Sequence, residues 1–179
     1  MSFLENTRRP EGIGGRVMVC MMNIGHRALA GWGRSFLTLP AEAKVLDCGC
    51  GGGANLRPLL KKCPQGAVKG IDYSAVSVAK MPFASAEFDA VTAFETVYFW
   101  GELPQCFQEI YRVLKPDGTF LICNECGGDR AGDDKWTRRI AGMTVYRDTQ
   151  LSAALEQAGF RELRIHKSKR GWLCVSARK

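Results

Sequence analysis

The sequence predicts one α/β domain with a doubly wound, mostly parallel sheet, helices on both faces and a C-terminal antiparallel hairpin. Three observations support this fold class. The chain has 179 residues, which is enough for a single core. Short apolar runs alternate with helical patterns from residue 43 to residue 123, as is typical of parallel sheets. Two apolar runs joined through Arg170-Gly171 indicate the hairpin.

We expect residues 1–40 to form an N-terminal helical segment that acts as a lid, and residues 41–179 to form the core. Pro40 ends the first segment because proline cannot continue a helix. The expected strands of the core are residues 43–48, 67–71, 88–94, 119–123, 160–165 and 172–177. The expected helices are residues 53–62, a helix from Ala75 capped by Ser74, residues 104–114 and residues 149–158.

The composition is that of an ordinary globular protein. The chain is 46% hydrophobic and 24% charged, with a mean hydropathy of −0.13. These values exclude a disordered tail and a collagen-like fibre. No apolar run approaches the roughly 18 residues that span a bilayer, and residues 1–15 are polar. We therefore expect a cytoplasmic protein with no membrane partner.

The charge and the cysteines do not reveal the function. A net charge of +7 favours an anionic partner, but the basic residues are scattered, so we do not expect nucleic acid as the partner. The eight cysteines are interpreted as small buried side chains. Cys123-x-x-Cys126 has the spacing of zinc ligands, yet Cys48-x-Cys50 is not the second pair that a closed site needs. We therefore expect no metal site.

The stretch that carries chemistry is Val45-Leu46-Asp47-Cys48-Gly49-Cys50-Gly51-Gly52-Gly53. It reads as a strand, a turn without bulky side chains and the start of a helix. Such a turn lets a ligand contact bare backbone at a helix N-terminus. Asp72 ends the next strand, where a carboxylate can accept hydrogen bonds from both hydroxyls of a ribose. The pattern therefore predicts a cofactor that contains a nucleoside.

Two classes of cofactor fit these glycines. Gly49-x-Gly51-x-x-Ala54 satisfies the loose dinucleotide fingerprint, so a dehydrogenase stays an alternative. Asp47 argues against it, because a carboxylate at the strand end repels a pyrophosphate. S-adenosylmethionine instead brings a sulfonium and an ammonium to this place, and electrostatics favour it.

Four segments resemble the class I S-adenosylmethionine-dependent methyltransferases of the small-molecule type, which have a Rossmann-like fold. The segments are V-L-D-C-G-C-G-G-G, G-I-D-Y-S, M-P-F-A-S-A-E-F-D-A-V and E-I-Y-R-V-L-K-P-D-G-T-F-L-I. They occur in the family's order between residues 43 and 123. The resemblance implies methyl transfer from S-adenosylmethionine to a small-molecule acceptor by direct in-line displacement, with S-adenosylhomocysteine as product.

The resemblance also implies positions for the cofactor. Asp47, Gly49, Gly51 and Gly53 would line its methionine end, Asp72 its ribose and Tyr73 its adenine. Phe94, Glu95 and Thr96 fall where cofactor and acceptor meet. To the cofactor-binding set we add three neighbours in or next to these two segments: Cys50, Asn55 and Ser74.

The sequence departs from the family at one junction. Members of the family have a longer helix after the Asp-Tyr-Ser element, and then a strand whose acidic end binds the adenine amino group. Here Lys80 runs directly into Met81, so one family strand is missing near Lys80–Met81. Either that strand has been lost, or a disordered segment lies unresolved between these two residues. We expect an unresolved segment, because the 13 residues from Ala75 to Glu87 are barely enough for a crossover between two parallel strands.

Glu95 is the first candidate for a general base, because it ends a strand at the carboxyl edge of the sheet. His26 and Tyr98 are the other catalytic candidates, and Tyr98 could line an acceptor pocket. Two functions stay open beside a small-molecule methyltransferase. They are a nucleic-acid methyltransferase, suggested by the net charge, and a non-catalytic module that binds S-adenosylmethionine.

Overall fold

The computed structural model describes residues 12, 15, 21, 24–72 and 77–179 of the chain. Six strands form one sheet in the order β2-β1-β3-β4-β6-β5. The strands are β1 Lys44–Cys48, β2 Ala67–Ile71, β3 Phe88–Phe94, β4 Leu114–Asn124, β5 Arg161–Lys167 and β6 Leu173–Arg178. The helices are α2 Arg27–Ser35, α3 Leu56–Leu60, α4 Leu103–Val113, α5 Asp134–Arg139 and α6 Asp148–Gln157, with a short 3-10 turn at Val97–Phe99.

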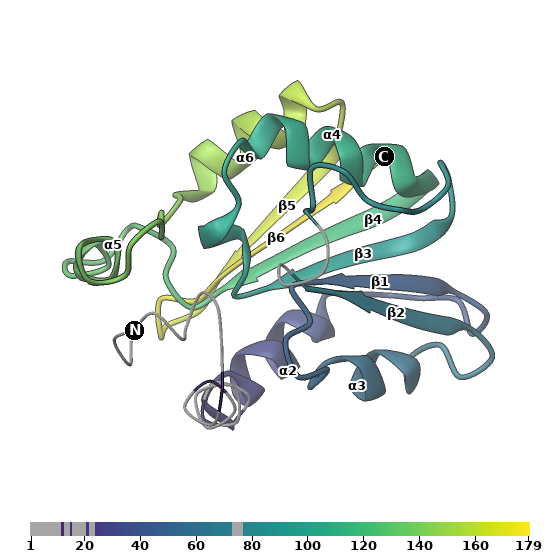
Figure 1. Ribbon diagram of the computed structural model, residues 1–179, viewed down its shortest axis with the longest axis horizontal. Helices are drawn as coiled ribbons and strands as arrows, with labels where there is room; N and C mark the ends of the chain where they lie inside the picture. The colour runs from purple at the N-terminus through teal and green to yellow at the C-terminus, as the bar shows by residue number, and fades with distance from the viewer. Residues whose placement is uncertain (1–11, 13–14, 16–20, 22–23, 73–76) are drawn as a thin grey trace.

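The predicted fold class is confirmed. Strands β2, β1, β3 and β4 are mutually parallel, whereas β6 runs antiparallel to both β4 and β5. Helices α4 and α6 cover one face of the sheet, and α2 and α3 cover the other (Figure 1). The carboxyl ends of the four parallel strands therefore meet at one edge, where the functional side chains were expected.

The two faces bury separate apolar clusters, as the alternation of side chains along β4 illustrates. Phe120 and Ile122 pack on the α4 and α6 side, whereas Leu121 and Cys123 pack on the α2 side. All four are at most 1% exposed. Residues Phe120–Cys123 of β4 are thus buried on both faces, which explains why this part of the strand is a continuous apolar run.

The expectation of an unresolved segment between Lys80 and Met81 is wrong. The structure covers residues 1–179 of a 179-residue chain. No strand or helix occurs among the described residues 77–87, so the family strand is lost here and β2 is the edge strand. The expected helix from Ala75 starts outside the described residues. The residues from Ser77 to Glu87 form turns and bends and no helix.

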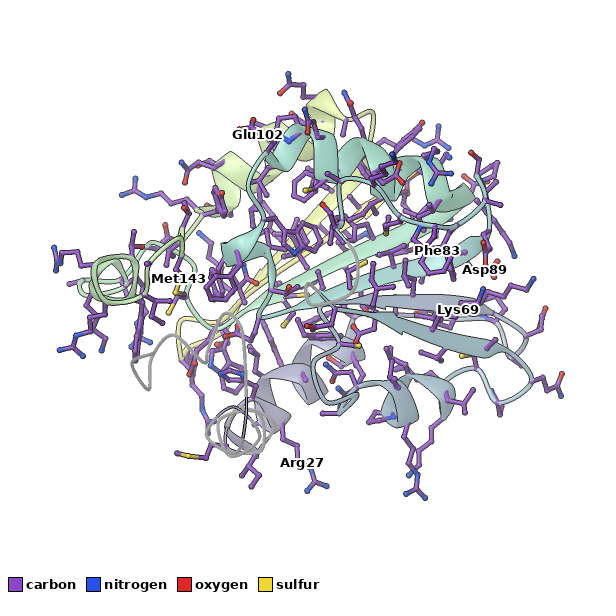
Figure 2. All side chains as sticks on the ribbon, viewed as in Figure 1. Arg27, Lys69, Phe83, Asp89, Glu102 and Met143 are labelled. Carbon is purple, nitrogen blue, oxygen red and sulfur yellow. The ribbon has the colours of Figure 1, made fainter. Side chains whose placement is uncertain are left out.

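The shortened crossover stays in place through contacts with α4. The backbone N–H of Met81 donates to Glu109 at 2.8 Å, and Arg112 binds the same carboxylate at 2.7 Å. Phe83 packs edge-on against Phe88, and the Lys69 ammonium lies 5.2 Å from the Phe83 ring centre (Figure 2). A segment of turns and bends thus packs against α4 and β3 at this place.

Helix α2 lies in the expected N-terminal lid segment, and it packs closely against β4. A Cβ at Gly33 would come within 2.6 Å of Cys123 Sγ and 3.1 Å of Phe94 Cε1. Glycine at this position therefore sets the distance between helix and sheet. Within the described residues, no helix is long and apolar enough to cross a membrane.

We predict that Gly33→Ala destabilises the protein and that Gly31→Ala does not. The new methyl group at residue 33 must push α2 away from β4, which costs about 1–3 kcal/mol. At Gly31 the nearest atom is 3.9 Å away, so alanine should stabilise the helix by about 0.5–1 kcal/mol. Urea unfolding of both variants measures the difference. Equal stabilities would contradict this account of the α2–β4 contact.

Candidate functional site

The turn after β1 has the bare backbone that its glycines predict. Gly49, Gly51 and Gly53 all have positive φ angles of 80°, 49° and 78°. The N–H groups of Gly49 and Cys50 both donate to the carbonyl of Ile71, at 2.8 and 3.0 Å. The turn is thus fastened to the end of β2.

The three glycines do different work. A Cβ at Gly49 would lie 2.2 Å from Thr96 Oγ1, so this glycine lets β1 and β3 end side by side. A Cβ at Gly53 would touch Leu56 of α3 at 3.2 Å. A Cβ at Gly51 would meet nothing within 4 Å. Gly51 therefore borders open space, as the backbone of a ligand cradle should.

Two carboxylates belong to the strand ends around this turn, Asp47 in β1 and Asp72 just after β2. Asp72 Oδ2 accepts a hydrogen bond from the N–H of Gly51 at 2.8 Å. Asp47 is 1% exposed, and its Oδ1 accepts from the Thr92 hydroxyl at 2.6 Å. Its Oδ2 is buried without a hydrogen-bond partner. An unpartnered buried carboxylate oxygen is expensive, and it suits a cationic or hydrogen-donating ligand.

Burial raises the pKa of Asp47 to about 7, although the Thr92 hydroxyl and the Arg34 guanidinium act to lower it. Arg34 reaches from α2 toward this turn and donates to Asn55 Oδ1 at 2.6 Å. The predicted cofactor residue Asn55 thus has a protein partner. Arg34 was not foreseen, because nothing in the local sequence indicates that α2 approaches this edge.

The remaining predicted cofactor residues separate into three groups. Cys50 is half-buried and packs on Gly70, where a Cβ would lie 2.7 Å from its sulfur. The side chains of Phe94 and Thr96 make contacts inside the protein. Phe94 packs in the apolar cluster on the α2 side, and Thr96 accepts a hydrogen bond from the Trp100 indole at 3.2 Å. Tyr73 and Ser74 lie outside the described residues.

The three catalytic candidates do come together. Glu95 ends β3 with a left-handed φ of 60°, and its Oε2 lies 3.6 Å from His26 Nε2. Its Oε1 accepts from the backbone N–H of Glu125 and lies 3.3 Å from the Tyr98 hydroxyl. Tyr98 is 2% exposed, and its hydroxyl also accepts from the Cys126 N–H at 2.8 Å. Tyr98 therefore positions Glu95 from inside the fold.

Glu125 joins this group and was missed by the sequence analysis. Its Oε2 lies 3.6 Å from His26 Nε2, the same distance as Glu95 Oε2. The available signal was its place just beyond the fourth parallel strand, at the same edge as Glu95. Burial raises the pKa of Glu95 to about 7, although the charge of His26 lowers it. Burial lowers the pKa of His26, but the Glu125 and Glu95 carboxylates outweigh that effect and raise it overall.

The fold is a Rossmann-like α/β domain with the glycine turn, Asp47 and Asp72 at the carboxyl edge of its sheet. Residues 46–122 match the family described as a methyltransferase domain. The matched residues are thus similar to a methyltransferase domain, in agreement with the class I S-adenosylmethionine-dependent family that the resemblance implied. S-adenosylmethionine is the cofactor of this class.

Similar proteins support this assignment. Cycloartenol-C-24-methyltransferase from Arabidopsis thaliana is 30% identical over 148 residues, which are 65% of this chain and 44% of that protein. Cycloartenol-C-24-methyltransferase 1 from Oryza sativa subsp. japonica is 34% identical over 149 residues, 65% of this chain and 43% of that protein. The chain thus spans less than half the length of these relatives.

The fold resembles that of a Haemonchus contortus phosphoethanolamine N-methyltransferase 2, solved with phosphomonomethylethanolamine and S-adenosylhomocysteine. The TM-score is 0.78 at 14% sequence identity, covering 100% of this chain and 61% of that chain.

We predict that Asp47 makes the stability of the ligand-free protein depend on pH. Its pKa of about 7 in the folded state lies above its ordinary value of 3.8, so the neutral form favours folding. The contribution of Asp47 to the free energy of unfolding should be fully present below pH 4. It should be lost as the pH rises through 7, and the loss should be about 4 kcal/mol at most. Unfolding free energies of wild type and Asp47→Asn, compared from pH 4 to 8, test this. A pH-independent difference would contradict it.

Proposed function

We propose that this chain transfers a methyl group from S-adenosylmethionine to a small-molecule acceptor by in-line displacement. One observation carries the proposal. Gly51 borders open space and donates its N–H to the Asp72 carboxylate, and Asp47, in the strand before the turn, keeps a buried Oδ2 without a protein partner. A ligand with ribose hydroxyls at one end and positive charge at the other complements both groups.

Each residue of the cradle then has a task toward the cofactor. S-adenosylmethionine supplies a methyl group activated by its sulfonium charge. Asp72 would accept hydrogen bonds from the ribose, and Asp47 would face the positively charged end. Gly51 would keep a side chain out of the cofactor's space, and Gly49 and Gly53 stay proposed as its backbone surroundings. Cys50, Asn55, Tyr73, Ser74, Phe94 and Thr96 stay proposed as its surroundings.

The acceptor would lie on the side of Glu95 and His26. Methyl transfer depends mainly on placement and on removal of water, so a largely buried wall is useful. The Glu95 side chain is 13% exposed and that of His26 is 30% exposed. Met21 and Ile24 are exposed hydrophobic residues on the segment leading to His26, and they suit a partly apolar acceptor.

Charge at the site favours a small molecule over nucleic acid. Asp72, Glu95 and Glu125 place carboxylates along the edge where an acceptor would enter. Such groups repel a phosphate backbone. The sterol C-24 acceptors named for the relatives are also small molecules. The lost adenine-contacting strand favours weaker cofactor binding, so a non-catalytic binding module is the second candidate.

We predict that Asp72→Ala weakens S-adenosylmethionine binding by about 1–3 kcal/mol, the scale of lost charge-assisted hydrogen bonds. Calorimetric titration of the wild type and the variant measures this. Asp117→Ala is the matched control, since Asp117 is exposed and pairs with Arg161 on the hairpin strand β5. Unchanged affinity in Asp72→Ala would overturn the ribose assignment. A wild type that does not bind S-adenosylmethionine would overturn the proposed function, and binding without methyl transfer to any acceptor would support the binding module.

We further predict that Gly51→Ala lowers cofactor affinity while the protein still folds. The added methyl group projects into the open space, whereas the left-handed backbone costs about 1–2 kcal/mol. The dissociation constant should rise at least about tenfold, while thermal melting shows a cooperative transition lowered by a few degrees. Wild-type affinity in Gly51→Ala would show that the cofactor does not use this space.

A further inference from the structure

Three side chains with metal-binding atoms converge at the carboxyl edge, beside the cradle. His26 stands immediately before α2, Glu95 follows β3 and Glu125 follows β4. One atom from each, the imidazole nitrogen and two carboxylate oxygens, lies within 4.8 Å of the others. These residues are 30 to almost 100 positions apart in the sequence, so the tertiary fold alone brings them together.

The spacing of these atoms fits a shared ion better than direct contact. His26 Nε2 lies 3.6 Å from both Glu95 Oε2 and Glu125 Oε2, which is longer than a hydrogen bond. A divalent ion with bonds of about 2.0–2.2 Å separates neighbouring ligand atoms by about 3–4 Å. Small side-chain rotations would therefore place all three atoms around one ion.

Glu95 is arranged as metal ligands usually are. Its Oε1 is fixed by the N–H of Glu125 and by the Tyr98 hydroxyl, while Oε2 points to His26. The Tyr98 hydroxyl is itself held by the N–H of Cys126. Such outer hydrogen bonds orient a ligand and leave its second oxygen for the ion.

The charge balance also favours a cation. Two carboxylates face one imidazole, which gives a net charge of −2 when the imidazole is neutral. The Glu95 side chain is largely buried, and its ion-pair partner among the described residues is His26. A divalent ion would neutralise the pair without a second basic side chain.

We propose that His26, Glu95 and Glu125 bind a divalent first-row transition-metal ion, with open positions that face the acceptor. One imidazole and two carboxylates suit manganese, iron or zinc. Three protein ligands leave coordination positions free, as in catalytic rather than structural sites. The ion would hold an acceptor through a hydroxyl or carboxylate oxygen. That consequence rests on the proposed function, whereas metal binding itself does not.

Manganese is the probe for the test. The described part of the chain has seven free cysteines, which would capture zinc, and Mn²⁺ binds thiols weakly. Mn²⁺ is titrated into the purified protein without S-adenosylmethionine, and the free ion is followed by its electron paramagnetic resonance signal. We expect one bound ion per chain, and a dissociation constant raised at least about tenfold in His26→Ala and in Glu125→Gln.

Matched controls separate the site from the general surface. Glu162→Gln and His166→Gln change an exposed glutamate and a half-buried histidine on β5, and both should bind Mn²⁺ like the wild type. Glu125 is 55% exposed, so Glu125→Gln should fold normally even if His26→Ala does not. Circular dichroism and thermal melting check this.

The outcomes are distinguishable from failure of the proposed function. Asp72→Ala should keep wild-type Mn²⁺ binding, because Asp72 lies outside the cluster. No binding by the wild type up to about 1 mM Mn²⁺, or wild-type affinity in Glu125→Gln, overturns the metal site. Site-specific Mn²⁺ binding in a protein that does not bind S-adenosylmethionine supports the metal site and overturns the methyltransferase proposal alone.

Discussion

The close approach of three strand ends around Gly49 is the constraint on which the site depends. The N–H groups of Gly49 and Cys50 share the Ile71 carbonyl, so the turn after β1 is tied to β2. Thr96, just beyond β3, fills the space that a side chain at residue 49 would need. This packing keeps the turn compact and leaves Gly51 beside open space. It also buries Asp47 beneath the turn, where one of its oxygens has no protein partner.

The buried carboxylates at this edge destabilise the fold, and a bound ligand would explain why they are there. Asp47 and Glu95 both lie where water is excluded, and burial raises the pKa of each to about 7. Stability alone would favour apolar side chains in their places. Glu95 additionally adopts a left-handed backbone, which is costly for a residue other than glycine. Two such costs at one sheet edge agree with a binding site whose ligands compensate the charges.

The shortened crossover shows how the fold tolerates the loss of an element. The glutamate and arginine of α4, Glu109 and Arg112, hold the segment around Met81, so the apolar face of the sheet stays covered. The parallel order of the remaining strands is unchanged, because β1 still lies between β2 and β3. The change leaves β2 as the edge strand of the sheet. It also removes any contact with an adenine that the missing strand would provide.

The sequence by itself determined the class of fold, the glycine turn after β1 and most strand positions, although β4 starts at Leu114 and not at residue 119. Apolar runs such as residues 88–94 and glycines such as Gly51 act locally, through burial and backbone freedom, so a single chain reveals them. It also placed Glu95 and Asp72 correctly at strand ends. Only the tertiary structure brought His26, Glu95 and Glu125 together and directed Arg34 to Asn55. Those contacts depend on how α2 packs against β4, and a long-range packing distance leaves no local pattern in the sequence.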